Sequence, residues 1–148
     1  MHCKKKPHKK FEFGNKVGLA LTATKNFILA IRAFHGNPYD GHTLNQNVND
    51  VQKNAQQTIE KLVVDRGYKG NDFKHKKKIF MPLSKRVTLS KSDKAFIKRR
   101  NAIEPIIGHL KTYFRLSRNF LCGKIGDVLN ALRSAIGFNF RKIARAPV

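Results

Sequence analysis

The segment from Arg99 to Lys111 holds the residue types best suited to chemistry on a phosphate group. Its single acid, Glu104, lies between cations. On a helix of roughly 100° per residue, Arg100, Glu104 and Lys111 fall within about 40° of one another. Two interpretations fit a carboxylate between two cations: a surface ion pair worth a few tenths of a kcal/mol, or a metal-binding glutamate beside phosphate-binding cations. The segment alone leaves both open.

Asp65 is the second candidate acid, because it ends the apolar run Lys61–Asp65 (KLVVD). In an open α/β sheet, ligands and catalytic groups gather at the carboxyl ends of strands. The alternative is a turn or helix-cap aspartate, since Arg66 and Gly67 follow and Asp is common in turns. From the residues alone this alternative is the more common case.

Three blocks of the sequence resemble one family. The pattern Arg100-x3-Glu104-x6-Lys111 resembles the C-terminal signature of bacterial insertion-sequence DDE transposases, Tyr-x2-Arg-x3-Glu-x6-Lys, with Ile97 at the tyrosine position. Residues 34–44 (FHGNPYDGHTL) and 63–70 (VVDRGYKG) resemble two blocks of the insertion-sequence-five group, the second of which carries that family's second catalytic aspartate. The blocks occur in the family's order.

The resemblance implies an α/β fold with a ribonuclease-H-like catalytic core and C-terminal helices. It also implies metal-dependent DNA strand cleavage and transfer, with Mg²⁺ or Mn²⁺ as the cofactor. Asp65 would be the second acid and Glu104 the third, both as catalytic residues and as metal ligands. The implied partners are the terminal inverted repeats of an insertion sequence and intact transposase subunits.

Several cations are candidates for binding the DNA backbone. The resemblance gives this role to Arg100 and Lys111. Basic runs such as Lys74–Lys78 are usually just solvated, but in an enzyme that acts on DNA they suit a track along the phosphates. The further candidates are Arg99, Lys76, Lys77, Arg115 and Arg118.

The first catalytic aspartate of the family has no counterpart in the positions where it is expected. It should lie on a strand before Phe11, yet residues 1–10 (MHCKKKPHKK) contain no acid, and Glu12 and Asp40 do not match its position. We therefore expect a basic flexible arm over 1–10 and an N-terminally truncated catalytic domain over 11–148, inactive alone. Whether the chain is an enzyme stays open, and a non-catalytic basic DNA- or RNA-binding protein is the alternative.

Charge and hydropathy limit the classes of partner. The 31 Lys and Arg outnumber 9 Asp and Glu, giving a formal net charge of +22 that favours a polyanion. The longest apolar run, near residues 27–31, is far short of the ~20 residues of a membrane span, so no membrane partner is expected. Cys3 and Cys122 form no CxxC unit, which suits free thiols in a reducing cytosol. With the resemblance, this predicts a bacterial cytoplasmic protein, at the nucleoid when on DNA.

The elements that must position these residues follow from the hydropathy pattern. Strands are predicted over 11–24 and 26–34, with a turn at 23–26, and short strands over 61–65 and 79–83. A helix capped by Thr43 is predicted to run to about Leu62.

The C-terminal half is predicted to be helical. Ser92 or Asp93 would cap the helix leading to Glu104, and Pro105 would kink it or begin a new one. Asp127 would cap the last helix, whose inward face is predicted to comprise Val128, Leu132, Ala135, Ile136, Phe140 and Ile143.

Overall fold

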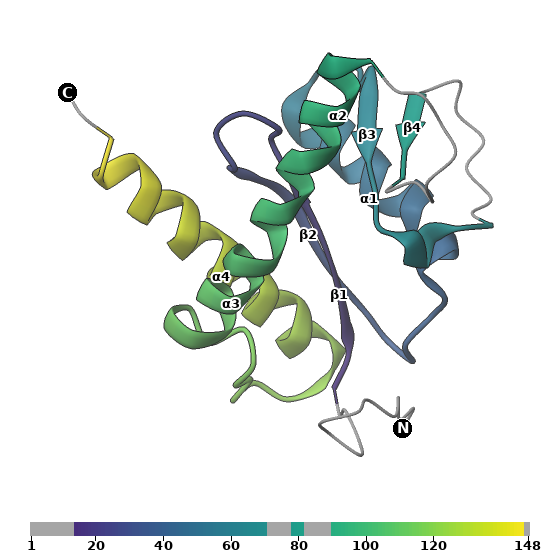
Figure 1. Ribbon diagram of the computed structural model, residues 1–148. Helices are drawn as coiled ribbons and strands as arrows, with labels where there is room; N and C mark the ends of the chain where they lie inside the picture. Colours follow the sequence, from purple (N-terminus) through teal and green to yellow (C-terminus); the bar gives the residue numbers. More distant parts are fainter. Residues whose placement is uncertain (1–13, 71–77, 82–89, 147–148) are drawn as a thin grey trace, which may run out of the picture.

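The protein is a mixed α/β structure in which helices surround two small sheets (Figure 1). The structure, a computed structural model, describes residues 14–70, 78–81 and 90–146. The basic arm over 1–10, Glu12, Lys76 and Lys77 lie outside these residues. The α/β class agrees with the prediction. The elements are β1 (Lys16–Leu21), β2 (Ile28–Phe34), α1 (Asp40–Ala55), β3 (Lys61–Val63), β4 (Lys78–Phe80), α2 (Lys91–Lys98), α3 (Ile103–Tyr113) and α4 (Gly123–Ala144), with short 3₁₀ segments η1 (Arg66–Tyr68) and η2 (Arg99–Ala102).

Strands β1 and β2 form an antiparallel hairpin, as predicted. Their register pairs Lys16 with Phe34 and Leu19 with Ile31. The turn is closed locally, because the Thr22 hydroxyl accepts a hydrogen bond from the Phe27 N–H at 2.9 Å. Asn26 takes the left-handed conformation there, with φ of 51°, which Asn tolerates better than most residues.

Helix α1 begins at Asp40, so the prediction of Thr43 as its N-cap is wrong. Thr43 lies inside the first turn, where its hydroxyl donates to the Asp40 carbonyl at 2.8 Å. The helix also ends earlier than predicted, because Gln56 is left-handed at φ 51°. Ile59 and Leu62, predicted on the helix stripe, lie beyond its end and pack against the buried cluster that α1 shares with Val64.

Strands β3 and β4 form a parallel pair in register from Lys61 opposite Lys78 to Val63 opposite Phe80. The pairing extends by one bond, from the Val64 N–H to the Phe80 carbonyl at 3.0 Å. The strand predicted over 61–65 is therefore present but shorter, and Asp65 lies two residues past its end.

Helices α2 and α3 are joined by η2, so they follow one another without a loop (Figure 1). Ser90, rather than Ser92 or Asp93, is the N-cap of α2: its hydroxyl accepts from the Asp93 N–H at 3.1 Å. Pro105 is the third residue of α3. A first-turn proline removes no helical hydrogen bond, because those N–H groups have no partner within the helix. Of the two predicted outcomes, a new helix with Pro105 at its first position is the nearer, but the helix begins two residues earlier, at Ile103.

Helix α4 differs most from its prediction. It begins at Gly123 with Cys122 as N-cap, and Asp127 lies in its second turn. Its buried residues are Gly126, Ala131, Ser134, Ala135 and Phe138, so only Ala135 of the predicted inward face is buried.

Polar anchors fix this rotation of α4. The Asn139 amide exchanges two hydrogen bonds with the Ile28 backbone, at 3.0 Å and 2.9 Å, and the Ser134 hydroxyl donates to the Phe114 carbonyl at 2.7 Å. Gly137 permits a close approach, since a Cβ there would lie 2.9 Å from a Phe114 ring carbon.

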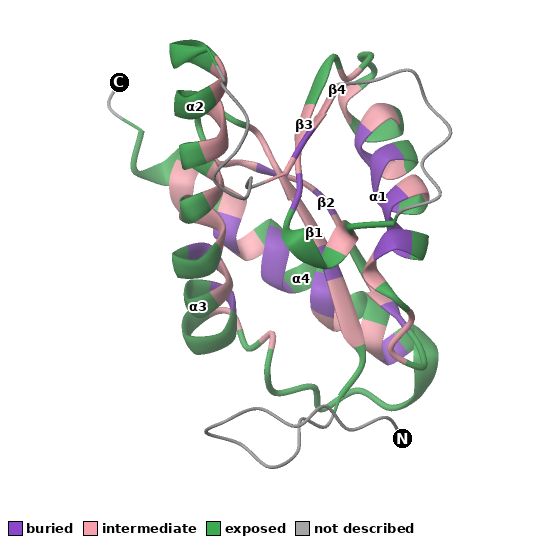
Figure 2. Ribbon diagram, turned by 45° about the vertical axis from the view of Figure 1, so that its right-hand side comes forward, coloured by how far each residue is buried: buried purple, intermediate pink, exposed green. Residues whose placement is uncertain are grey.

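Two apolar clusters hold the helices and strands together (Figure 2). One lies between the hairpin and helices α3 and α4, and centres on Ile28, Ile106, Leu110, Ala135 and Phe138. The other lies between α1 and the β3–β4 pair, and comprises Leu44, Val48 and Val64. Helix α1 also contacts β1 and β2, so it connects the two clusters.

Replacing Leu110 with Ala should destabilise the protein by about 2–5 kcal/mol, because the side chain is fully buried and its removal leaves a cavity. Leu121→Ala removes the same atoms from a side chain that is 40% exposed, and should change stability by about 0.5 kcal/mol or less. Urea unfolding followed by circular dichroism measures both. Equal losses would contradict the assignment of this core.

Candidate functional site

Asp65 lies at the exit of β3, where its side chain caps the following 3₁₀ turn. One carboxylate oxygen accepts a hydrogen bond from the Arg66 N–H at 2.6 Å. The other lies 2.9 Å from Nη2 of Arg100, and the Asp65 side chain is 58% exposed. The turn-cap and the site interpretations of Asp65 are therefore compatible: one oxygen caps the turn while the other faces the α2–α3 helix.

Arg100 brings the two candidate acids to one guanidinium. Its Nη2 lies 2.9 Å from Asp65 and 4.0 Å from Oε1 of Glu104, at the start of α3. Arg100 is largely covered, at 21% exposure, whereas Glu104 is 80% exposed. The three side chains come from the turn after β3, from η2 and from α3, so the acids that are 39 positions apart in sequence meet through tertiary structure.

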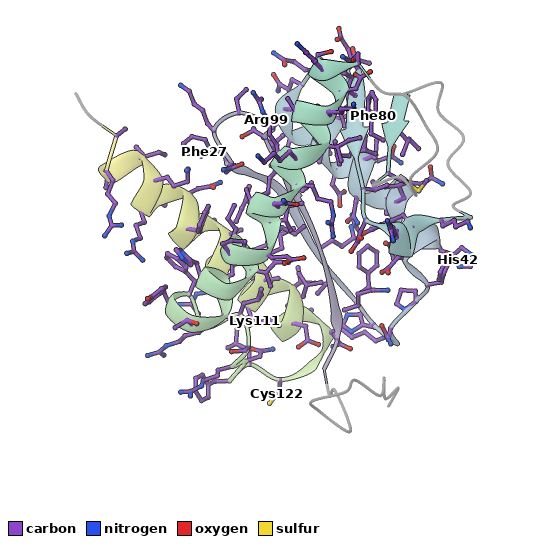
Figure 3. The ribbon with its side chains drawn as sticks, in the orientation of Figure 1. Phe27, His42, Phe80, Arg99, Lys111 and Cys122 are labelled. Carbon is purple, nitrogen blue, oxygen red and sulfur yellow. The ribbon has the colours of Figure 1, made fainter. Side chains whose placement is uncertain are left out.

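The remaining predicted cations do not all join this group. Lys111 lies in the last turn of α3, exposed and about 10 Å along the helix from Glu104 at 1.5 Å per residue. Figure 3 places Arg99 and Lys111 toward the two ends of the η2–α3 stretch. Arg99 is exposed and donates to the Ala23 carbonyl of the hairpin at 3.4 Å. Arg115 and Arg118 are exposed in the turn after α3.

The block over residues 34–44 packs against the block that carries Asp65. Asp40 forms an ion pair with Lys16 of β1 at 2.5 Å, and a Cβ on Gly67 would lie 2.6 Å from the other Asp40 oxygen. The Tyr39 hydroxyl donates to the Lys69 carbonyl. Tyr39 and Asp40, at the start of α1, therefore fix the chain on the far side of Asp65.

Tyr68 belongs to the same contact. Burial raises the pKa of its phenol above the ordinary value, and the nearby carboxylates of Asp40 and Asp65 act in the same direction, while a hydrogen bond with Thr43 opposes them. The ring packs against the cluster of Leu44, Val48 and Val64. A neutral phenol in this position adds no further charge beside Asp65.

Lys16 is the residue of this arrangement that the sequence reasoning did not identify. It is one of 31 Lys and Arg residues, and nothing in its neighbourhood along the chain distinguishes it. The one hint in the sequence that a cation is needed here was Asp40 in a block of turn residues. A carboxylate that the fold partly buries needs a partner.

Oxygen ligands of the kind that hard divalent cations prefer are present, but in small number. Asp65 and Glu104 supply two carboxylates around one cationic position, which suits the donor chemistry of Mg²⁺. Among the described ranges 14–70, 78–81 and 90–146, no group of three or more His, Cys, Asp or Glu side chains is arranged to hold a metal ion. Cys122 is exposed as a free thiol.

Adding a methyl group at Gly67 tests the packing of the two blocks. Gly67→Ala should destabilise the protein by about 1–3 kcal/mol, because the new Cβ displaces an Asp40 carboxylate held by Lys16. Gly108→Ala, in an open position on α3, should instead stabilise it by about 0.5–1 kcal/mol. Thermal unfolding reports both changes, and a neutral Gly67→Ala would show that the blocks are not closely packed.

The comparisons with known proteins agree with these blocks. The transposase DDE domain family matches residues 2–140, which is nearly the whole chain. The comparisons with curated proteins and with solved structures gave no match. Helices able to cross a membrane are lacking in the part of the chain that the structure describes. The family match spans all three sequence blocks together with Asp65, Arg100 and Glu104, and the chain therefore belongs to the transposase DDE domain family.

Proposed function

We propose that this chain is part of a DDE transposase core of the insertion-sequence-five group, with a ribonuclease-H-like arrangement, and that Asp65 and Glu104 are two acids of its metal site. The observation that carries the proposal is the single guanidinium of Arg100 at 2.9 Å from Asp65 and 4.0 Å from Glu104. Two carboxylates this close to one cation define a position where positive charge is favourable.

Asp65 and Glu104 would hold the divalent ion, either Mg²⁺ or Mn²⁺. When bound, such ions supply Lewis-acid stabilisation at a scissile phosphate. The chain's own residues define the position: the backbone of η1 orients Asp65 through the Arg66 N–H, and the first turn of α3 places Glu104. Arg100 balances both carboxylates, so a divalent ion would compete with its guanidinium.

Exposed cations on the same helical stretch and beyond it would bind the DNA backbone. Lys111, Arg115 and Arg118 are exposed, and the surplus of positive charge would attract DNA and release its counterions. By resemblance, the substrate would be the terminal inverted repeats of an insertion sequence. Arg100 is engaged with carboxylates, so it would contact phosphate only after leaving them.

A second candidate is a nucleic-acid-binding protein that does not cut. One observation favours it: among the described residues, no third metal-ligating side chain is grouped with Asp65 and Glu104. Two carboxylates hold a pair of hard cations poorly, since each such ion needs about six oxygen ligands. This candidate would bind nucleic acid through the same basic surface but would not cleave it.

The metal site can be tested without catalysis. Mg²⁺ at about ten times its dissociation constant should stabilise the wild type by about 1.4 kcal/mol, or roughly 4 °C in melting temperature. Asp65→Asn should lose most of this shift, although Asn still caps the turn. Asp50→Asn breaks an arginine pair elsewhere, at 2.6 Å from Arg32, and should keep it. Equal shifts in all three proteins, measured by scanning calorimetry, would reject the site.

The two candidate functions are separated by an assay of binding and nicking on inverted-repeat DNA. We expect binding that weakens steeply with salt, and no metal-dependent cleavage by the chain alone. Cleavage that disappears in Glu104→Gln would show a complete site and overturn the expected inactivity. A preference for RNA, together with indifference to Asp65→Asn and Glu104→Gln, would reject the transposase assignment.

The same assay has a matched control for the DNA surface. Arg118→Gln should reduce the slope of log affinity against log salt by about one, because one phosphate contact is lost. Lys53→Gln removes another exposed charge, from α1, away from the proposed surface, and should leave the slope nearly unchanged.

A further inference from the structure

The turn that follows α3 holds an arginine in a backbone conformation that costs free energy. Arg115 has φ of 58°, in the left-handed region that favours glycine because a Cβ there crowds the backbone. Among the described residues, the other non-glycine positions of this kind are Asn26, Asn37 and Gln56. Asparagine tolerates this region, and Gln56 ends α1 much as Arg115 follows the end of α3. Glycine is the usual residue at such a helix end, so the arginine side chain itself needs a reason.

Polar side chains of α4 hold this turn at both of its ends. At its start, the Ser134 hydroxyl donates to the Phe114 carbonyl at 2.7 Å. At its end, the Asn119 amide donates to Oδ1 of Asp127 at 2.8 Å. Asp127 and Ser134 are seven residues apart, which places them on the same side of a helix. The turn is therefore attached along one side of α4, at the opposite end of the molecule from α2 (Figures 1 and 2).

Bonds within the turn and two apolar side chains complete its attachment. The Leu116 N–H donates to the Leu110 carbonyl and the Arg118 N–H to the Arg115 carbonyl, each at 3.0 Å. Phe114 and Leu116, on either side of Arg115, are half-buried and pack against the cluster that contains Leu110. Arg115 itself is exposed. Its backbone is thus fixed from both sides while its side chain faces solvent.

The cations of this region have no acidic partner. We call them the turn cations; they are Lys111, Arg115 and Arg118, all exposed. Within residues 14–70, 78–81 and 90–146, none of the three forms an ion pair. The acid that anchors the turn, Asp127, accepts hydrogen bonds from Asn119 and Asn15 instead. Like charges held on one short segment repel one another, and a bound anion would relieve that repulsion.

The dipole of α3 is another reason for cations at this point, because the C-terminal end of a helix attracts positive charge. It accounts for Lys111, which lies in the last turn. It does not account for the left-handed Arg115, since glycine could take that position while Lys111 supplies the charge. A cation that complements a dipole also needs no fixed backbone, whereas this turn is bonded at both ends.

We propose that residues 114–119 form a preorganised phosphate-binding turn, in which Arg115 binds a phosphate of the DNA backbone and Asp127 and Ser134 of α4 are positioning residues. A guanidinium can bind a phosphate through two parallel hydrogen bonds. A side chain whose backbone is fixed beforehand loses less conformational freedom on binding. The left-handed conformation of Arg115 therefore costs stability in folding and favours binding.

This inference rests on the proposed binding of DNA but not on the metal site. The turn begins about 15 Å along α3 from Glu104, at 1.5 Å per residue. Binding at the turn can therefore be measured without divalent metal and with both candidate acids intact.

Replacing Arg115 with Gly separates stability from binding. Loss of the Cβ relieves the left-handed backbone, so the melting temperature should rise by about 1–3 °C. Affinity for a labelled DNA duplex of roughly 20 base pairs should fall about tenfold at about 0.1 M salt, and the slope of log affinity against log salt should fall by about one. Scanning calorimetry and fluorescence anisotropy measure the two effects. A variant with a damaged fold would lose both stability and affinity.

Two further variants serve as controls. Gln56→Gly relieves the same conformation, at φ 51°, so it should raise the melting temperature similarly and leave DNA binding unchanged. Arg115→Lys keeps both the charge and the strained backbone. It should melt like the wild type, keep the salt slope, and lose less affinity than Arg115→Gly, because an ammonium still contacts phosphate as a point charge.

The positioning role is tested in two backgrounds. Ser134→Ala and Asn119→Ala each remove one attachment of the turn, and each should weaken DNA binding by about three- to tenfold. In a protein that already carries Arg115→Gly, the same changes should have little further effect, because the side chain they position is absent. Asn119 is exposed, so its variant keeps the test available if Ser134→Ala does not fold.

The possible results distinguish this inference from the function on which it rests. An unchanged salt slope in Arg115→Gly, with a wild type that binds DNA, would overturn the inference alone. So would a lower melting temperature of that variant, which would show that the arginine stabilises the turn. Equal losses from Asn119→Ala in both backgrounds would reject the positioning role. A wild type that binds no duplex DNA at any salt concentration would reject the proposed function and this inference together.

Discussion

The scarcity of negative charge is the constraint on which this structure depends. With nine acids against 31 Lys and Arg, each carboxylate can find a cation on almost any neighbouring element. Four described acids each join two elements, through the pairs Asp40 with Lys16, Asp50 with Arg32, Asp65 with Arg100 and Asp93 with Lys61. Partly exposed pairs contribute only about 0–1 kcal/mol each, so they select the placement of elements more than they stabilise the fold.

The candidate site also depends on the pairing of scarce carboxylates with cations. Arg100 serves two carboxylates from different elements, and the more exposed of them, Glu104, is held at 4.0 Å. The first residue of α1 supports this arrangement from the other side, because Asp40 packs over Gly67 just beyond Asp65. Two sequence blocks that are separated by the rest of α1 thus form one structural unit around one of the candidate acids.

Helix α4 shows how polar contacts can determine which apolar face is buried. Its most hydrophobic line, which includes Leu132 and Ile136, remains exposed. The buried residues are Gly126, Ala131, Ser134, Ala135 and Phe138. The Ser134 hydroxyl and the half-buried Asn139 amide make hydrogen bonds that would be lost if the helix turned. A buried polar group without a partner costs about 1–3 kcal/mol, so these bonds favour the observed rotation and leave an apolar surface open.

The sequence by itself determined the features that depend on local patterns. These are the β1–β2 hairpin with its turn at Asn26, a helix that follows the turn-rich segment beginning at residue 35, a short strand leading to Asp65, and a break in the helical pattern near Pro105. The three spaced blocks, which the family match over residues 2–140 also spans, identified the family. Turn propensities, proline geometry and motif spacing act over a few residues, so they can be read directly from the chain.

Only the tertiary structure decided which of several equivalent residues make each contact. The helix caps fell on Tyr39, Ser90 and Cys122 rather than on the predicted residues, because packing sets where a helix can begin. Lys16 was indistinguishable among the many cations until β1 brought it to Asp40. The buried side of α4 was equally undetermined, since an amphipathic pattern ranks the faces of a helix by hydropathy, whereas the fold chooses the one that satisfies its hydrogen bonds.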